Sequence, residues 1–345
     1  MADQKNLFLA VALSIVILIT WNVMVEQPKM EKERIALEQQ QAAQKAQQAG
    51  GKIATTPGVP ATSSPVQAGD PVQAAPSGPR LGSAPSASGL GAVGLSREDA
   101  LKKVARLKID TPRLQGSISL VGARIDDLTL KDYRVSLDAE SEQIDLLQPI
   151  HADKPYYAEF GWLSPGTKMP SRETVWTPSR GALSPDNPVT LSWNNGEGLL
   201  FEQDFVIDEN FLIAITQRVR NTSTKDVSIA PYGLISRTSV PNILGFYILH
   251  EGPLGVFDKT LKEVDYDDLF DDGAVLPAVR QETTGGWIGF TDKYWLVALL
   301  PDSDKPLRTS FNAGRRGVEP VFQTDYLGDV IAVPAGGSIE RTDRL

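Results

Sequence analysis

The chain has 345 residues, of which 41% are hydrophobic, and a formal net charge of −9, a size that accommodates a membrane anchor and one sizeable globular domain. It contains no basic block, so we expect no nucleic-acid partner. It contains no cysteine and only two histidines, His151 and His250, which excludes disulfides, thiolate metal sites and a cysteine nucleophile.

The first predicted element is an uncharged apolar run from Leu7 to Val25. Its length matches the ~20 residues that an α-helix needs to cross the hydrocarbon core of a bilayer. A secretory signal peptide is the alternative, because Lys5 precedes the run, but a signal core spans only about 7–15 residues and ends in a small-residue cleavage site. We therefore predict a transmembrane helix, anchored in lipid by Leu7, Phe8, Leu9, Val11, Leu13, Ile15, Val16, Ile17, Leu18, Ile19, Trp21 and Val25.

The charges that flank this run leave its orientation open. Lys5 lies on one side, and Lys29, Lys32 and Arg34 lie on the other. By the positive-inside rule, this count alone favours a cytoplasmic C-terminal side.

A polar linker, residues 26–95, follows the run. Residues 30–48 are rich in helix formers but lack a continuous apolar stripe, which predicts a solvated helix, with a partner-binding coiled coil as the alternative. From Gly50 to about Gly94 the chain is rich in Pro, Gly, Ala and Ser, which predicts a flexible tether. Residues 89–94 match G-x-G-x-x-G, but no strand precedes them, so we expect no nucleotide ligand.

After the linker, the hydrophobic pattern becomes alternating. Ser96 begins a capping box before a short helix that we expect from Arg97 to about Arg106. Runs of period two then predict strands at 114–121, 124–130, 143–147, 156–163, 189–193, 200–207, 211–219, 227–236, 286–290, 295–300, 307–311 and 330–333, with 338–345 also strand-like. In the run 211–219, the side chains expected on one face are Phe211, Ile213, Ile215 and Val219. Many short strands separated by turn signals predict a mainly β, antiparallel sandwich over residues 96–345.

Three groups of side chains are candidates for binding or chemistry. An acidic group could bind Ca²⁺ but lacks the order of an EF-hand loop, and a solvated turn is the alternative: Asp265, Asp267, Asp268, Asp271 and Asp272. His250 and Glu251 could act as an acid/base pair, or His250 could be satisfied at a sheet edge. A set of aromatic residues could line a groove for a sugar or peptide, or belong to the core: Trp162, Trp176, Trp193, Trp287, Tyr294 and Trp295. No nucleophile with its base is visible, so we expect no enzymatic activity, no metal and no cofactor.

Several segments resemble the YidC family of bacterial membrane protein insertases. Residues 5–18 are similar to the family's first transmembrane segment, and residues 111–120 and 122–133 resemble the opening strands of its large periplasmic domain. Residues 246–257, 262–268 and 286–301 resemble later parts of that domain. The positions that carry the resemblance are Pro112, Gly116, Asp126, Asp127, Tyr133, His250, Gly252, Gly255, Asp265, Tyr266, Trp287, Gly289, Asp292, Lys293, Tyr294 and Trp295.

The resemblance implies a bacterial inner-membrane protein with a cytoplasmic N-terminus, residues 1–6, and a periplasmic β-supersandwich. The family inserts and folds nascent membrane proteins, alone or with the Sec translocon, and uses no nucleotide. Family members continue into a five-helix membrane core with a hydrophilic groove. This sequence holds no second apolar span, so we expect it to be an N-terminal fragment without the groove residues.

Two alternatives remain open at this point. The first is a membrane-tethered carbohydrate-binding or carbohydrate-active domain, whose candidate residues would be His151, His250, Glu251 and the tryptophans. The second is a structural envelope protein with no ligand, which would require a natural chain that stops near Leu345.

Overall fold

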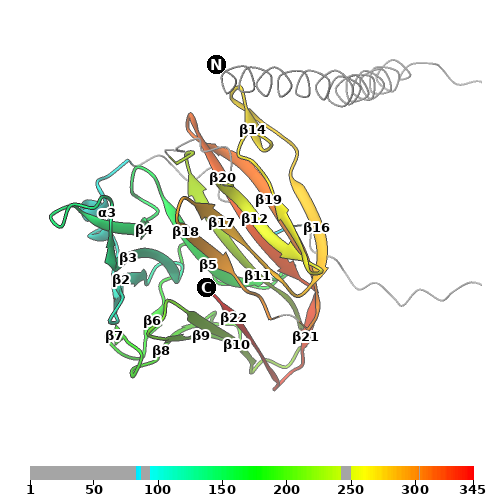
Figure 1. The fold of residues 1–345 in the computed structure, drawn as a ribbon. Helices are drawn as coiled ribbons and strands as arrows, with labels where there is room; N and C mark the ends of the chain where they lie inside the picture. Colours follow the sequence, from blue (N-terminus) through cyan, green and yellow to red (C-terminus); the bar gives the residue numbers. More distant parts are fainter. Residues whose placement is uncertain (1–82, 87–93, 242–249, 303) are drawn as a thin grey trace, which may run out of the picture. The chain divides into compact units, whose positions relative to one another are not determined.

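The computed structural model describes residues 83–86, 94–241, 250–302 and 304–345 (Figure 1). The predicted membrane span Leu7–Val25 and most of the linker lie outside these residues. In the four described ranges, no helix is both long and apolar enough to span a membrane.

Helix α3 (Arg97–Leu101) begins where we predicted but is shorter. The Ser96 side chain caps it, because its hydroxyl oxygen accepts a hydrogen bond from the Asp99 backbone N–H at 3.1 Å. The prediction of a helix to about Arg106 is wrong. Arg106 instead begins strand β1 (Arg106–Asp110), where its guanidinium pairs with the buried carboxylate of Asp126.

Strands dominate the described residues and are almost all antiparallel, which confirms the predicted mainly β class. The largest sheet has eleven strands. Along its main path run β16 (Val279–Thr284), β19 (Pro306–Arg316), β20 (Glu319–Gly328), β11 (Val227–Thr238), β5 (Tyr156–Leu163), β3 (Arg124–Arg134), β2 (Leu114–Ser119), β1 and β7 (Ala182–Leu183), with β21 (Ile331–Val333) beside β11 and β4 (Gln143–Leu147) beside β3. The β1–β7 pair is parallel.

Smaller sheets cover the inner face of this large sheet. A five-stranded sheet has the order β22 (Ser338–Arg344), β10 (Ile213–Asn221), β9 (Leu199–Ile207), β8 (Val189–Asn194) and β6 (Thr177–Pro178). A four-stranded sheet has the order β13 (Thr260–Glu263), β12 (Gly252–Phe257), β17 (Trp287–Asp292) and β18 (Trp295–Leu299), and β14 (Phe270–Asp271) pairs with β15 (Ala274–Val275). Phe160 of the large sheet, Phe205 of the five-stranded sheet and Phe290 of the four-stranded sheet belong to one hydrophobic core.

The period-two pattern places strands correctly where one face meets the core and the other meets solvent. In β10, Ile213, Ile215 and Val219 are buried on one face, as predicted. The prediction that Phe211 shares this face of the strand is wrong. Phe211 precedes β10, in the loop after β9, and its φ is +81°. The predicted β4 and β5 have the observed bounds, whereas the pattern missed β1, β6, β7, β12 to β16 and β20.

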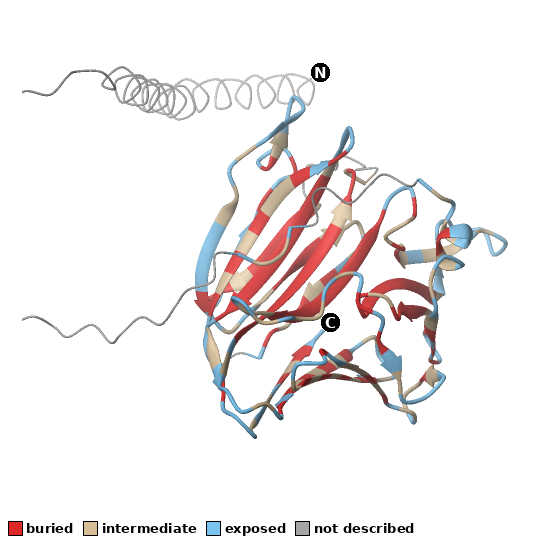
Figure 2. Cartoon of the chain, turned by 180° about the vertical axis from the view of Figure 1, so that it is seen from behind, coloured by how far each residue is buried: buried red, intermediate tan, exposed pale blue. Residues whose placement is uncertain are grey.

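The outer face of the large sheet is also covered, and Figure 2 shows its central strands as mostly buried. A second apolar cluster lies on this face: Tyr157, Ala230, Tyr232, Leu234 and Leu327. A strand covered on both faces shows no polar and apolar alternation. The missed strand β20 is such a strand, since eight of its ten residues are buried.

Candidate functional site

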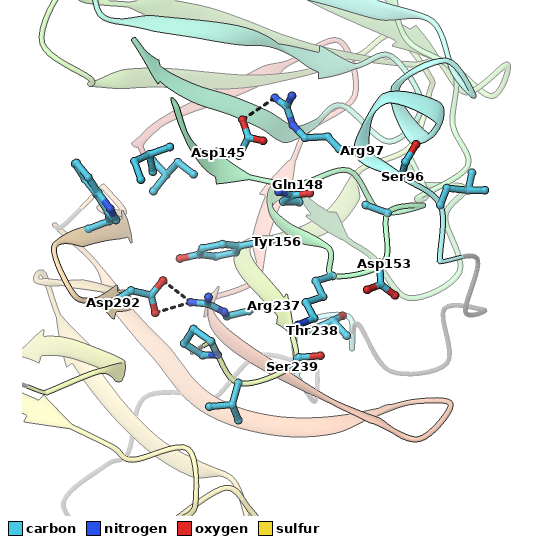
Figure 3. Close-up of a pocket in the computed structure, with 18 residues that line it drawn as sticks. Ser96, Arg97, Asp145, Gln148, Asp153, Tyr156, Arg237, Thr238, Ser239 and Asp292 are labelled. Carbon is cyan, nitrogen blue, oxygen red and sulfur yellow. Dashed lines mark hydrogen bonds and ion pairs between the residues drawn. The ribbon is translucent and has the colours of Figure 1, made fainter. Parts of the chain in front are cut away.

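A cleft of about 500 Å³ opens on the inner side of the large sheet (Figure 3). Its walls come from the start of α3, from β4 and β5, from the end of β11 and from the β17–β18 hairpin. A smaller apolar pocket of about 220 Å³ lies beside it, and Leu146 and Trp295 line both spaces. These two side chains therefore separate a polar cleft from an apolar pocket.

Arg237, at the end of β11, is the central charge of the cleft. Its Nη1 donates to both carboxylate oxygens of Asp292 on β17, at 2.6 and 2.5 Å, as the dashed lines in Figure 3 show. The guanidinium carbon lies 4.8 Å from the ring centre of Tyr156, within the range of a cation–π contact. These contacts tie the four-stranded sheet to β5 and β11 of the large sheet.

The opposite wall is held by a second arginine. Arg97 of α3 donates to the Thr129 hydroxyl at 2.9 Å and pairs with the carboxylates of Asp127 and, at 3.4 Å, Asp145. The Thr129 hydroxyl donates to Asp145 at 2.7 Å, so the side chains of β3 and β4 fix each other. The charges on both walls are mostly paired before any ligand enters.

The electrostatics of the cleft favour a polar, uncharged ligand. Three cationic and three anionic side chains line it: Arg97, Lys154, Arg237, Asp145, Asp153 and Asp292. A phenol is neutral at pH 7, and burial raises the pKa of Tyr156 well above its usual value of 10.0, so this side chain adds no charge to the cleft. An extended polypeptide backbone, which carries no net charge and many hydrogen-bonding groups, fits such a lining.

The apolar pocket is built around an aromatic pair. The rings of Tyr133, at the end of β3, and Trp295, at the start of β18, lie edge to face with centres 4.8 Å apart. Leu130, Phe211 and Leu296 add apolar surface to the same pocket. This pocket is chemically distinct from the cleft and can accept an aliphatic side chain.

Three of the residues identified by resemblance, Tyr133, Asp292 and Trp295, come together at the cleft and the apolar pocket. Lys293 and Tyr294 form the tip of the same β17–β18 hairpin, and Tyr294 is 77% exposed. Trp287 lies at the other end of β17.

The glycines identified by resemblance lie where strands approach too closely for a side chain. A Cβ on Gly116 would lie 1.9 Å from the Asp127 carbonyl oxygen, and one on Gly289 would lie 2.2 Å from the Val297 carbonyl oxygen. Gly252 and Gly255 occupy similar positions in β12. Pro112 lies exposed in the β1–β2 turn. These residues shape the sheets and do not line the cleft.

Asp126 and Asp127 are buried inside the large sheet. Asp126 pairs with Arg106, and burial raises its pKa while Arg106 opposes that shift. Asp127 pairs with Arg97 and accepts a hydrogen bond from Ser117 at 2.6 Å. Both carboxylates therefore fix the sheet behind the cleft wall.

His250 and the acidic group lie away from the cleft. The His250 Nε2 lies 3.0 Å from the Pro253 carbonyl oxygen, and its Nδ1 lies 3.4 Å from Asp265, so the ring is engaged at the edge of β12. The carboxylates of the acidic group are exposed around the buried Tyr266 and Leu269. Across the described ranges, no group of three or more acidic or histidine side chains is arranged to hold a metal ion.

The aromatic residues do not form one groove. Trp162 and Trp176 belong to the core, and Trp193 packs on Phe201 of the five-stranded sheet. Of the six, Trp295 lines the cleft. The cleft residues that sequence reasoning missed are Tyr156, Arg237 and Asp145. The available signal for Arg237 was its position directly after the predicted run 227–236, inside the observed β11.

The family model and the curated relatives that the chain matches name the same family. Residues 106–345 match the family model described as the YidC periplasmic domain. The chain is 39% identical to the membrane protein insertase YidC of Methylorubrum extorquens over 99% of its length and 54% of the relative's length. It is 39% identical to that of Bradyrhizobium diazoefficiens, over all of this chain and 54% of the relative, and 38% identical to that of Rhizobium meliloti, over 99% and 53%.

The chain therefore spans about half the length of the curated relatives that it matches. Among solved structures, a galactose mutarotase related enzyme from Lactobacillus acidophilus aligns with a TM-score of 0.47 and 12% identity, over 70% of this chain and 96% of that one. A putative aldose 1-epimerase from Escherichia coli aligns with a TM-score of 0.43 and 11% identity, over 70% and 97%.

Proposed function

The chain belongs to the YidC family of membrane protein insertases, and from this premise we propose that it is the N-terminal part of an insertase of the bacterial inner membrane. The observation that carries the proposal is the identity of 39% along 99% of the chain, which includes the predicted membrane span as well as the β domain. The relatives carry the name membrane protein insertase, which is the activity proposed for the whole protein.

We further propose the arrangement of the whole protein. Residues 1–6 would lie in the cytoplasm, residues 7–25 would anchor the chain in the lipid bilayer, and residues 26–95 would tether a periplasmic supersandwich, residues 96–345. The chain would then continue into a membrane core, since the relatives are about twice as long. Insertion itself would occur in that core, where a wet groove lowers the cost of several kcal/mol for each unsatisfied polar group in hydrocarbon.

The role proposed for the β domain is contact with nascent membrane proteins and with Sec translocon components. The cleft supports contact with an extended polypeptide, because its paired charges and aromatic wall suit a neutral backbone with apolar side chains. The carbohydrate alternative has less support, since His250 is engaged with Pro253 and the tryptophans are dispersed.

A depletion strain that lacks its own insertase tests the proposal. The complete gene product should restore insertion of a newly made membrane protein, measured by protease protection, and should co-purify with Sec components. A version without residues 96–345 should lose that co-purification. Failure of the complete product to restore insertion would contradict the insertase proposal, and unchanged co-purification after the deletion would contradict the role given to the β domain.

Alkaline phosphatase fused after Leu345 tests the orientation separately. The fusion should be active, because the enzyme folds in the periplasm. An inactive but stable fusion would place the β domain in the cytoplasm and would restore the orientation that the lysine and arginine count favours.

A further inference from the structure

Residues 83–86, within the predicted linker, lie against the outer face of the large sheet; we call them the strap. The side-chain amide of Gln323 on β20 donates to the Pro85 carbonyl oxygen at 3.0 Å. The guanidinium of Arg172, in the loop after β5, donates to the Ser86 carbonyl oxygen at 2.6 Å. Ala84 packs, partly buried, against the outer apolar cluster. Composition alone predicted a flexible segment here.

The register of the sheet shows that the strap crosses the strands. Ser83 and Ala84 line a pocket with residues of β16, β19 and β20. Pro85 lines another pocket with Tyr232 of β11 and with Glu159 and Leu163 of β5. Because β20, β11 and β5 are consecutive neighbours in the sheet, the strap spans several strands and does not add a strand to an edge.

The two donors of this contact are held in place by the sheet. Gln323 is 2% exposed, and its amide nitrogen also donates to Asp325 at 2.8 Å, which fixes the direction of its second N–H. The Arg172 Nε lies 3.6 Å from the buried Glu159 carboxylate. The Tyr232 hydroxyl donates to the same carboxylate at 2.8 Å, so its ring is fixed beside Pro85.

We propose that the outer face of the large sheet is a docking surface for an extended, proline-containing segment, and that the chain's own strap is its occupant. Gln323 and Arg172 recognise backbone carbonyl oxygens, while the apolar cluster accepts a small side chain, here Ala84. A proline suits the contact, because it presets an extended backbone and loses little conformational freedom on docking. Under this proposal the strap packs on the β domain although it precedes Ser96 in the chain, and Ala84 covers part of the outer apolar cluster.

The absence of cysteine from the sequence allows a clean test by alkylation of single cysteines in the full chain. Ala84→Cys places a thiol on the docked side of the strap, and Ser83→Cys places one at its exposed neighbour as the matched control. We expect the thiol at position 84 to react with a maleimide about tenfold more slowly, because reaction requires local opening. Adding Gln323→Ala should accelerate that reaction about fivefold, the effect of losing one hydrogen bond.

The same acceleration should be absent in Gln115→Ala, which removes an exposed glutamine of β2 that lines neither of the two pockets shared with the strap. Equal rates at positions 83 and 84, or a slow rate that Gln323→Ala leaves unchanged, would overturn the proposal. Protection that rises with protein concentration would assign the occupant to a second copy and contradict docking within one chain. As a measurement without a new thiol, Ala84→Glu should lower the unfolding temperature, whereas Ser83→Glu should not.

Discussion

Replacing Asp325 with asparagine should remove a loss of stability that we expect in the native chain between about pH 4 and pH 6. Asp325 lies on β20 and is 4% exposed. Its carboxylate accepts hydrogen bonds from the side-chain amides of Gln323 and Asn312, both at 2.8 Å. Arg280, Glu282 and Arg308 line the same outer pocket. Burial raises the pKa of Asp325 from 3.8 to about 6, against the opposing effect of the two amides and Arg280.

Stability falls with rising pH because the folded and unfolded chains bind different numbers of protons. Below pH 3.8 the carboxyl is protonated in both the folded and the unfolded chain. Between 3.8 and about 6 only the folded chain holds the proton, so stability is lost as pH rises through this window. A pKa raised by about two units corresponds to a loss of roughly 3 kcal/mol of folding free energy. Asparagine does not titrate, so the variant should show none of this loss.

Unfolding by urea, followed by tryptophan fluorescence of the full chain in detergent at several pH values, measures the effect. Asp325→Asn should gain stability relative to the native chain as pH rises from 4 to 7. The matched control is Asp110→Asn, because two lysines lower the pKa of Asp110 to about 2 and its titration lies below the window. Parallel profiles of the native chain and Asp325→Asn would show that burial does not hold the proton on Asp325.

Two further predictions concern the apolar pocket and the sheet geometry. Tyr133→Ala and Trp295→Ala should be non-additive in unfolding free energy, with a coupling of about 1 kcal/mol from their edge-to-face contact, and additive effects would contradict a direct contact. Gly289→Ala should cost more than about 2 kcal/mol because its Cβ would press on the neighbouring strand. Gly181→Ala, where a Cβ meets open space, should cost less than ~0.5 kcal/mol, and equal losses in the two unfolding curves would refute this reasoning.

The sequence predicted those strands whose pattern is local. The strands β4 and β5 have the predicted bounds, although β5 has seven of its eight residues buried and does not alternate. Strand β12 was missed because Gly-Pro-Leu-Gly-Val-Phe reads as a turn, although its glycines serve close strand approach. The helix predicted to about Arg106 was too long, because the partner of Arg106, the carboxylate of Asp126, lies twenty residues away in the chain.

The cleft could be predicted less well than the strands because its contacts are non-local. Resemblance identified Asp292 and Trp295, and their hairpin position follows from the turn between two apolar runs. The residues that lie beside them in the cleft cannot be predicted from the resemblance or from this turn. Arg237 meets Asp292 across fifty-five residues, and this contact exists because β17 and β18 of the four-stranded sheet pack beside β11 and β20. No local pattern of either segment specifies that packing.

The contacts of the strap with the outer face of the large sheet differ from the flexible segment that composition predicts for residues 83–86. A segment of Pro, Ala and Ser cannot build a core of its own, so composition predicts disorder for it. It can still dock on a preformed surface that supplies both the apolar contact and the hydrogen-bond donors. Here Gln323 and Arg172 supply the donors, and they read only the carbonyl oxygens of the strap. Every residue carries a backbone carbonyl, so this contact requires few particular side chains in the strap. The contact therefore cannot be predicted from the strap's sequence and is found only in the three-dimensional structure.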